Sequence, residues 1–235
     1  MIDFYHYLCS LWRKKGDRRV QSTIARIRKI TEVSLVKTLY LNIKYFGLKG
    51  IAYPYILVSR YTKIHASGGR IIVNGVHRFG IRIGFTGIDI FDGKRQNSIF
   101  SNNGTIEFNG YCHLGSGSRI SNVGTLVFGN DFNITANSTI VCHDKIIFGN
   151  DVLCSWNCIF IDTDFHHIDN NVNHSPIYVG NRVWICQNVT VLKGSSISDG
   201  SVCAANSFIH KKFEECNLLI AGNSEVIRRE ISWER

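Results

Sequence analysis

The sequence holds very little proline and methionine, with two Pro and one Met among 235 residues, against 21 Gly. Alanine is also sparse, while Ile, Val, Phe and Asn are frequent. The shortage of helix-favouring residues argues against a mainly helical protein. Abundant glycine together with β-branched and aromatic residues instead favours short strands joined by many turns.

Long apolar segments and paired cysteines are also missing. No run of about 18 uncharged apolar residues occurs, so no membrane-spanning helix is predicted. Asp3 interrupts the short apolar N-terminus, and we expect no signal peptide. The eight cysteines form no CxxC pair. We therefore expect reduced, buried thiols in a cytoplasmic protein, and neither a metal site nor a disulfide framework.

Acidic residues are scarce near the N-terminus. Residues 1–50 contain eleven Lys or Arg and three Asp or Glu, so their net charge is 11 − 3 = +8, against +9 for the whole chain. Basic segments suit nucleic acid, an anionic membrane, or a solvated helix face. Because no nucleic-acid-binding module is recognisable, nucleic acid is not expected. Amphipathic helices within 18–45 could contact an anionic membrane, on its inner face, or could form a cap and oligomer contact; both interpretations remain open.

The rest of the chain repeats with a period of six. The stretches GTIEFNG (104–110), GTLVFGN (124–130) and DKIIFGN (144–150) are spaced by twenty residues, and PIYVGN (176–181) follows. Between and after them, one apolar residue recurs at every sixth position. These positions are Phe108, Leu114, Ile120, Phe128, Ile134, Ile140, Phe148, Cys154, Phe160, Val179, Ile185, Val191, Ile197, Cys203 and Ile209.

A period of six fits neither a helix nor an alternating strand. It is typical of a parallel β-helix, in which three six-residue rungs form one triangular coil and one side chain per rung points inward. Weaker repeats at 69–75 and 81–91 predict that the coils begin near residue 68. We therefore expect an all-β domain over 68–223, preceded by a basic, partly helical extension over 1–67. A short C-terminal cap over 224–235, helix or strand, would close the last coil.

The repeat is interrupted once, within IFIDTDFHHIDNNVNHSPIYVG (159–180). Phe160 and Val179 are nineteen residues apart where one rung needs six, so about thirteen residues must loop out of the coil. The predicted loop, 161–176, is rich in acids and histidines. Loops on a rigid scaffold carry function more often than the scaffold itself.

These motifs resemble the hexapeptide-repeat acyltransferases, in particular the polysaccharide and sugar O-acetyltransferase branch. The resemblance covers about 68–223 and is carried by DTDFHHI (162–168), by IYVGNRVWICQNVTVLKGSSISDGSVCAANSFIHK (177–211) and by LIAGN (219–223). It implies a left-handed parallel β-helix, a homotrimer, acetyl-CoA as donor, and active sites between adjacent subunits. It further implies transfer of an acetyl group to a sugar hydroxyl, in the modification of a cell-surface polysaccharide such as capsule or O-antigen.

The resemblance also implies roles for individual residues. It places the catalytic base at His166, which would deprotonate the acceptor hydroxyl, and an imidazole suits this task near neutral pH. Asp162 or Asp164 would orient the ring, and the sequence does not decide which. Residues that would line the acceptor cleft are Asn137, His143 and Asp144.

The donor site is expected further along the chain. Trp184 and Gln187 would line the acetyl or pantetheine end of acetyl-CoA, and the small residues Ala205 and Ser207 would let it lie against the coil. Cations would meet the CoA phosphates. The segment GNSEVIRRE (222–230) departs from the family pattern, and either Arg228 or Arg229 is expected to replace a cation found elsewhere in the family. The remaining donor-binding candidates are His210, Lys211, Lys212 and Asn223.

Two other functions remain open. A zinc-dependent hydro-lyase of the carbonic anhydrase type shares this fold and uses three histidine ligands, for which His143, His166, His167 and His174 are candidates. A non-enzymatic β-helix that binds glycan is the third interpretation. We expect no metal, because the motifs downstream of the loop suit a CoA donor and would have no purpose in a zinc enzyme.

Overall fold

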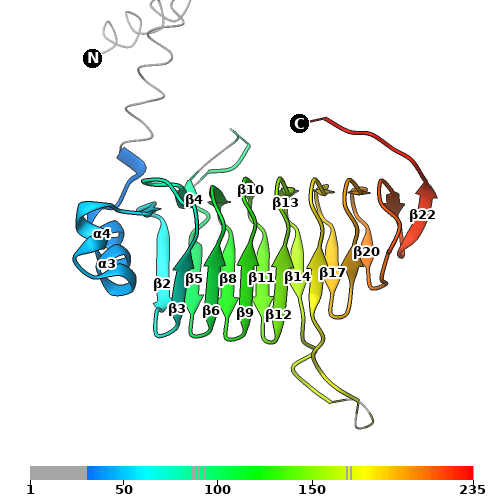
Figure 1. The fold of residues 1–235 in the computed structure, drawn as a ribbon, viewed down its shortest axis with the longest axis horizontal. Helices are drawn as coiled ribbons and strands as arrows, with labels where there is room; N and C mark the ends of the chain where they lie inside the picture. Colours follow the sequence, from blue (N-terminus) through cyan, green and yellow to red (C-terminus); the bar gives the residue numbers. More distant parts are fainter. Residues whose placement is uncertain are drawn as a thin grey trace, which may run out of the picture. The chain divides into compact units, whose positions relative to one another are not determined.

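The computed structural model describes residues 31–234 apart from 86, 87, 89, 93, 168 and 170. The chain divides into two compact units, residues 1–33 and 34–235, and the second contains the helices and strands labelled in Figure 1. Cys9 and most of the basic N-terminal segment lie outside the described residues. Among the helices that are described, none is long and apolar enough to cross a membrane, since the longest has 12 residues.

Twenty-two strands are described, and they form three sheets that run along the length of the molecule (Figure 1). The first sheet contains β1 (Ile56–Val58), β4 (Ile81–Phe85), β7 (Cys112–Ser116), β10 (Phe132–Ala136), β13 (Leu153–Trp156), β16 (Trp184–Ile185), β19 (Val202–Cys203), β21 (Leu219–Ala221) and β22 (Glu225–Arg228). The second contains β2 (Thr62–Ala66), β5 (Ser98–Asn102), β8 (Arg119–Asn122), β11 (Thr139–Cys142), β14 (Ile159–Ile161), β17 (Thr190–Leu192) and β20 (Phe208–Ile209). The third contains β3 (Arg70–Val73), β6 (Thr105–Phe108), β9 (Thr125–Phe128), β12 (Lys145–Phe148), β15 (Ile177–Val179) and β18 (Ser196–Ile197).

Successive strands belong to successive sheets, so the chain winds around a common axis. From β1 to β21, strands pair in parallel with the equivalent strand of the next coil, as β9 does with β12 through Phe128 and Phe148. This pairing confirms the predicted all-β parallel β-helix. Its left-handed sense is the one that the resemblance implies.

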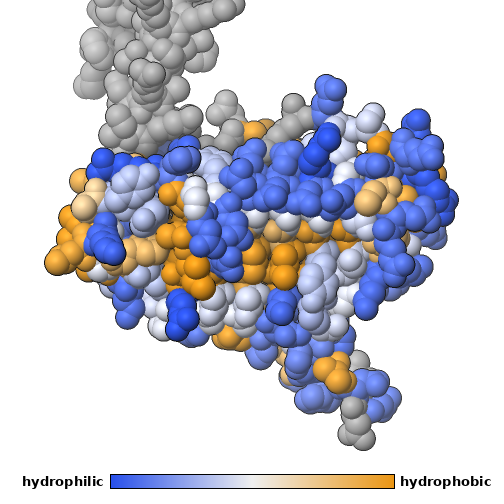
Figure 2. Space-filling model, in the orientation of Figure 1, coloured by the Kyte–Doolittle hydropathy of each residue, from blue (hydrophilic) through white to orange (hydrophobic). Residues whose placement is uncertain are grey.

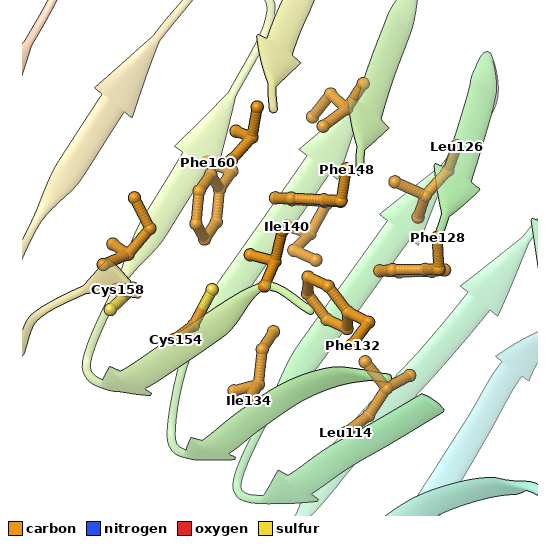
Figure 3. Close-up of a cluster of buried hydrophobic side chains, with 14 of the residues drawn as sticks. Leu114, Leu126, Phe128, Phe132, Ile134, Ile140, Phe148, Cys154, Cys158 and Phe160 are labelled. Carbon is orange, nitrogen blue, oxygen red and sulfur yellow. The ribbon is translucent and has the colours of Figure 1, made fainter. Parts of the chain in front are cut away.

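All fifteen predicted inward positions are buried, with at most 3% of any of them exposed. In the third sheet, Phe128 stacks on Phe108 and on Phe148, with ring centroids 5.3 and 5.6 Å apart. Figure 3 shows the rings of Phe128 and Phe148 with Phe132, Phe160 and the thiol of Cys154 in the interior. The six-residue period therefore identifies the core correctly, because every sixth side chain reaches the same inner column.

Asparagines at the corners bind equivalent residues one coil away. Asn137 Nδ2 donates to Asn157 Oδ1 (2.5 Å), and the ladder continues through Asn188 to Asn206. All four asparagines have positive φ, between 50° and 62°, which this residue tolerates better than most. The ladder supports the corners between the first and second sheets.

The coils begin earlier than the sequence indicates. Strands β1 and β2 already pair with β4 and β5, so the first coil starts at Ile56, twelve residues before the predicted start near residue 68. Helix α3 (Leu35–Phe46) packs on β1 and is followed by the short helix α4 (Lys49–Ala52). Helix α3 therefore covers the first coil, as a partly helical extension would.

Buried polar groups attach α3 to the first coil. Asn42 is fully buried; its Nδ2 donates to the carbonyl of Ile56 (2.7 Å), and its Oδ1 accepts from the backbone N–H of Tyr55 (2.8 Å). The hydroxyl of Thr38 accepts from the N–H of Val58 at 3.1 Å. At the other end of the first sheet, β22 pairs antiparallel with β21, within the segment 224–235 for which a cap is predicted.

Candidate functional site

The loop rich in acids and histidines leaves the β-helix between β14 and β15, at the corner where the second sheet meets the third. Figure 1 shows it as a long yellow excursion below the coils. Its two arms pair with each other, because Thr163 and His174 form an antiparallel bridge and Asp164 N–H donates to Asn173 O (2.7 Å). The N–H of Ser175 donates to the carbonyl of Asp162 (3.0 Å). The loop is thus a hairpin on the edge of a rigid coil.

Asp162 anchors the base of this hairpin. Its carboxylate is fully buried and accepts from the backbone N–H groups of His143 (2.7 Å) and Asp144 (2.9 Å) in the preceding coil. It continues a column of buried corner residues that runs through Asn122 and Cys142. Asp162 was one of the two carboxylates predicted to orient an imidazole. In this structure its carboxylate binds backbone N–H groups and no imidazole nitrogen of a described residue.

The coils at this corner are closely stacked beneath the hairpin. A Cβ added to Gly124 would lie 2.3 Å from the carbonyl oxygen of Asp144 and 2.7 Å from that of His143. Only glycine therefore leaves room for the backbone that Asp162 binds. The backbone of His143 and Asp144 is thus packed between Gly124 of the preceding coil and Asp162 of the following one.

Lys193 joins the two arms of the hairpin to the next coil. Its ammonium lies 2.5 Å from Asp164 Oδ2 and donates to the carbonyl of Val172 at 3.0 Å. Either Asp162 or Asp164 was expected to orient His166, and the contact that Asp164 makes in this structure is with Lys193. The sequence does contain a signal for this lysine: Phe160 pairs with Val191, 31 residues later, so position 193 falls one coil above position 162.

The histidines of this corner differ in their surroundings. His174 Nδ1 lies 3.3 Å from Asp144 Oδ2, and both side chains are partly exposed. His143 packs its ring edge-on against Phe165, with centroids 5.7 Å apart. His167 Nδ1 lies 3.1 Å from Asn171 O. The side chain of His166 is exposed, and among the described residues it has no hydrogen-bond or ion-pair partner.

The acceptor-site candidates are thus divided. His143 and Asp144 lie at the base of the hairpin, where they contact Phe165 and His174 of the loop. Asn137 lies at the opposite edge of the second sheet, where its amide is engaged in the asparagine ladder. A pairing between Asp144 and His174 was not predicted, although both residues were recognised individually.

The first group of donor-site candidates lies at the edge between the first and second sheets. Trp184 is half-buried in β16; its Nε1 donates to Ser155 Oγ (3.3 Å), and its ring packs on Trp233 of the C-terminal segment. Gln187 and the exposed Ala205 occupy successive corners of this edge. Ser207 is buried, and its hydroxyl donates to the carbonyl of Ala204, so it supports the corner.

The second group lies on the hairpin side. His210, Lys211 and Lys212 follow β20 at the same corner as the hairpin, one coil beyond Lys193, and all three are exposed. His210 Nδ1 lies 3.1 Å from the hydroxyl of Ser224. Asn223 forms a bridge with Phe208 and is exposed, and Arg228 ends β22 at the surface. These cations therefore meet solvent where a phosphate group could reach them.

Within one chain the two edges are far apart. Asn188 at one corner and Lys193 at the next are five positions apart in the sequence, with β17 between them, which corresponds to about 16 Å of extended chain. A single subunit therefore does not bring Trp184, Gln187 and Ala205 together with His166.

The zinc interpretation requires at least three converging ligands. Across residues 31–234, with the gaps named above, no group of three or more His, Cys, Asp or Glu side chains is close enough to hold a metal ion. His143, His166, His167 and His174 all belong to this corner and its hairpin, but they do not converge on one point.

Known proteins similar to this chain are acetyltransferases. The chain is 39% identical to a probable macrolide acetyltransferase of Lysinibacillus sphaericus over 57 residues. The matched segment is 24% of this chain and 32% of that protein. The chain is 46% identical to the putative lipopolysaccharide biosynthesis O-acetyl transferase WbbJ of Escherichia coli K12 over 48 residues. This segment is 20% of this chain and 24% of WbbJ. The chain is 36% identical to the putative colanic acid biosynthesis acetyltransferase WcaF of the same strain over 59 residues. This segment is 25% of this chain and 32% of WcaF.

These matches span about a third or less of each relative's length. No family model matches the chain. Among solved structures, the chain is similar to the polySia-specific acetyltransferase NeuO, with a TM-score of 0.46 and 20% identity over 76% of this chain and 89% of that one. The sequence matches confirm the resemblance stated above: this chain carries a segment similar to bacterial acetyltransferases, on a parallel β-helix built from six-residue rungs.

Proposed function

We propose that this protein transfers an acetyl group from acetyl-CoA to a hydroxyl of a sugar in a cell-surface polysaccharide. The observation that carries the proposal is the hairpin of 161–176, which adds imidazoles and carboxylates to an otherwise regular corner of the β-helix. Sequence similarity to acetyltransferases that include putative polysaccharide-modifying proteins supports the same reaction. We place the reaction in the cytoplasm, where acetyl-CoA is made.

The proposed reaction is direct transfer with a general base. His166 takes the proton of the sugar hydroxyl while the oxygen attacks the thioester carbonyl carbon. The tetrahedral intermediate then collapses, the carbon–sulfur bond breaks, and the imidazolium returns its proton to the CoA thiolate. The products are an O-acetyl sugar and free CoA. This chemistry needs little beyond positioning, a base, and donors for the oxyanion.

A second histidine deserves a parallel test, because its geometry matches that of an oriented base. His174 faces the carboxylate of Asp144 at 3.3 Å, whereas the side chain of His166 extends into solvent. A carboxylate beside Nδ1 fixes the ring and stabilises the imidazolium that forms during proton transfer. Sequence resemblance favours His166, and local geometry favours His174.

Three single substitutions separate these roles: His166→Ala, His174→Ala, and His167→Ala as a control from the same hairpin. Acetyl-CoA consumption is followed by release of the free thiol, with a panel of bacterial polysaccharides as acceptors. We expect His166→Ala to lower turnover by roughly 10²- to 10⁴-fold, and His167→Ala to leave it within a few-fold. Unfolding midpoints should stay close to that of the wild type, because the side chains of His166 and His167 are exposed.

If His174→Ala alone abolishes turnover, His174 replaces His166 as the base. If no acceptor supports thiol release while the purified protein holds stoichiometric zinc, the hydro-lyase function is correct and the acetyl-transfer proposal fails. Glycan binding without thiol release would instead identify a non-enzymatic binding protein.

A further inference from the structure

Helix α3 carries apolar side chains on both its inner and its outer face. Toward the coils it turns Leu41, which is buried in the core, together with Thr38 and Asn42, which are buried and bound by backbone groups. A helix that caps a soluble protein normally buries its apolar stripe and exposes its polar one. In α3 the buried face is Leu41 with two polar residues, and a further set of apolar side chains is exposed on the other face, where the protein core does not account for them.

These side chains form a continuous apolar region with α4, which we name the outer apolar patch. It consists of Leu35, Val36, Leu39, Ile43, Leu48 and Ile51. Leu35, Val36 and Leu48 are the most exposed, at 73%, 79% and 82%, and the other three are each 45–47% exposed. Figure 2 shows the patch as an orange surface at the end of the molecule that carries α3 and α4. Exposed apolar patches of this kind mark interaction sites.

Cations predominate in the sequence that carries the patch, although Glu32 lies just before it. Residues 33–88 contain eight Lys or Arg and no Asp or Glu. Lys44 and Lys49 belong to α3 and α4 themselves and are exposed. The guanidinium of Arg78 donates to the carbonyl of Ala52 at 3.4 Å, and the backbone of Arg60 binds the ammonium of Lys37, so both arginines border the helices.

We propose that the outer apolar patch binds the surface of an anionic lipid bilayer. The apolar side chains would enter the boundary between headgroups and acyl chains, and the surrounding cations would bind the lipid phosphates. Helix α3 is 12 residues long, about 18 Å, so it lies on the bilayer and does not cross it. In a symmetric contact with a second copy of this chain, the same patch would bring the cations of residues 33–88 next to one another.

The proposal is tested by co-sedimentation of the full-length protein with vesicles, a measurement that does not depend on enzyme activity. The vesicles contain phosphatidylcholine alone or with 30% phosphatidylserine, roughly the anionic fraction that gives a cytoplasmic leaflet its surface potential. We expect binding to the mixed vesicles, weak binding to phosphatidylcholine, and release as the salt concentration rises. The double variant Leu35→Ser/Val36→Ser should weaken binding by about tenfold or more, because it removes apolar area without changing charge.

Matched control variants test whether binding depends on the apolar side chains and the cations of the patch in particular. Ile227→Ser removes an exposed apolar side chain from β22, at the opposite end of the coils, and should leave binding unchanged. Lys44→Gln/Lys49→Gln should weaken binding about tenfold, whereas Lys94→Gln/Arg95→Gln, with the same loss of charge, should have little effect. Equal binding of Leu35→Ser/Val36→Ser and wild type, or equal binding to both kinds of vesicle, overturns the proposal. So does a smaller assembly of that variant in sedimentation velocity, which would identify the patch as a contact between copies.

Discussion

At the scale of single residues, the thiols act as small apolar side chains. Cys154 and Cys203 occupy two of the inward positions of the six-residue repeat, one on each side of Ile185 in the first sheet. Burial raises the pKa of Cys112, Cys142, Cys154 and Cys203 far above the ordinary value for a thiol. It raises the pKa of Cys158 to about 12 and that of Cys186 to about 11. Reduced, buried cysteines were predicted from the sequence, and six of the seven described ones fit; Cys216 is exposed.

These shifts predict that the folded protein loses stability in alkaline solution. A thiol whose pKa is higher in the folded state stabilises that state fully below the unfolded pKa, near 9, and the contribution is lost as the pH rises toward the folded pKa. We expect the free energy of unfolding to fall above about pH 9, by up to about 1.4 kcal/mol per pH unit for each such thiol. Denaturant unfolding at pH 7.5, 9 and 10 measures this slope.

The substitution Cys154→Ala identifies the source of the slope. Because it removes a buried sulfur atom, it should lower the free energy of unfolding at pH 7.5. Because it also removes one ionisable group, the fall in that free energy above pH 9 should be less steep, by the contribution of one thiol. Cys216→Ala, at the exposed cysteine, serves as the control and should leave both the stability and the slope unchanged. Equal slopes for Cys154→Ala and wild type would show that the buried thiols do not control the alkaline transition.

At the scale of elements, the hairpin of 161–176 is separable from the coil that carries it. Its arms meet at the bridge between Thr163 and His174, and the buried carboxylate of Asp162 lies on the coil side of that bridge. Residues 164–173 therefore form the projecting part, held to the next coil through Lys193. The sequence predicted that about thirteen residues leave the coil but not how they pair, because pairing between the arms has no periodic signal.

Excision of the projecting part tests whether the hairpin serves function or stability. Replacing residues 164–173 with Asn-Gly keeps the bridged pair in a two-residue turn that suits a β-hairpin. Because the core and Asp162 are untouched, we expect the free energy of unfolding to change by no more than about 2 kcal/mol. Acetyl transfer should be lost, since His166 is removed. The measurements are denaturant unfolding and thiol release.

A variant that unfolds entirely would show that the hairpin is part of the scaffold. Substitution of Lys193 by Met provides the milder comparison, because it breaks the contacts to Asp164 and Val172 without shortening the chain. It should lower turnover less than excision does. Full activity of the excised protein would contradict the proposed role of the hairpin.

At the scale of the whole molecule, the candidate groups lie on two edges of the second sheet. His166 and its neighbours are at one edge, and Trp184, Gln187 and Ala205 are at the other, about 16 Å of chain away. The homotrimer implied by the resemblance would place one edge of a subunit opposite the other edge of its neighbour. We therefore propose that a complete site needs residues from two copies of the chain.

This arrangement predicts complementation between inactive variants. His166→Ala removes the base, and Ala205→Trp fills the donor edge with an indole, so each homo-oligomer should be inactive. When the two are unfolded and refolded together at equal concentration, about a quarter of the shared sites in a trimer receive two intact edges. Thiol release should then recover to about a quarter of the wild-type rate. No recovery, with mixed oligomers present, would place the whole site within one chain.

The sequence by itself determined the β-helix, its core and the place where the repeat is interrupted. Each of these depends on which side chains recur every six residues, and a repeated local pattern is fully contained in the sequence. The tertiary structure alone decided that Asp164 meets Lys193, that His174 meets Asp144, and that α3 presents Leu35 and Val36 outward while Asn42 is buried. Such contacts depend on which corners stack and on the direction a capping helix takes across the first coil, and neither is a property of any one stretch of sequence.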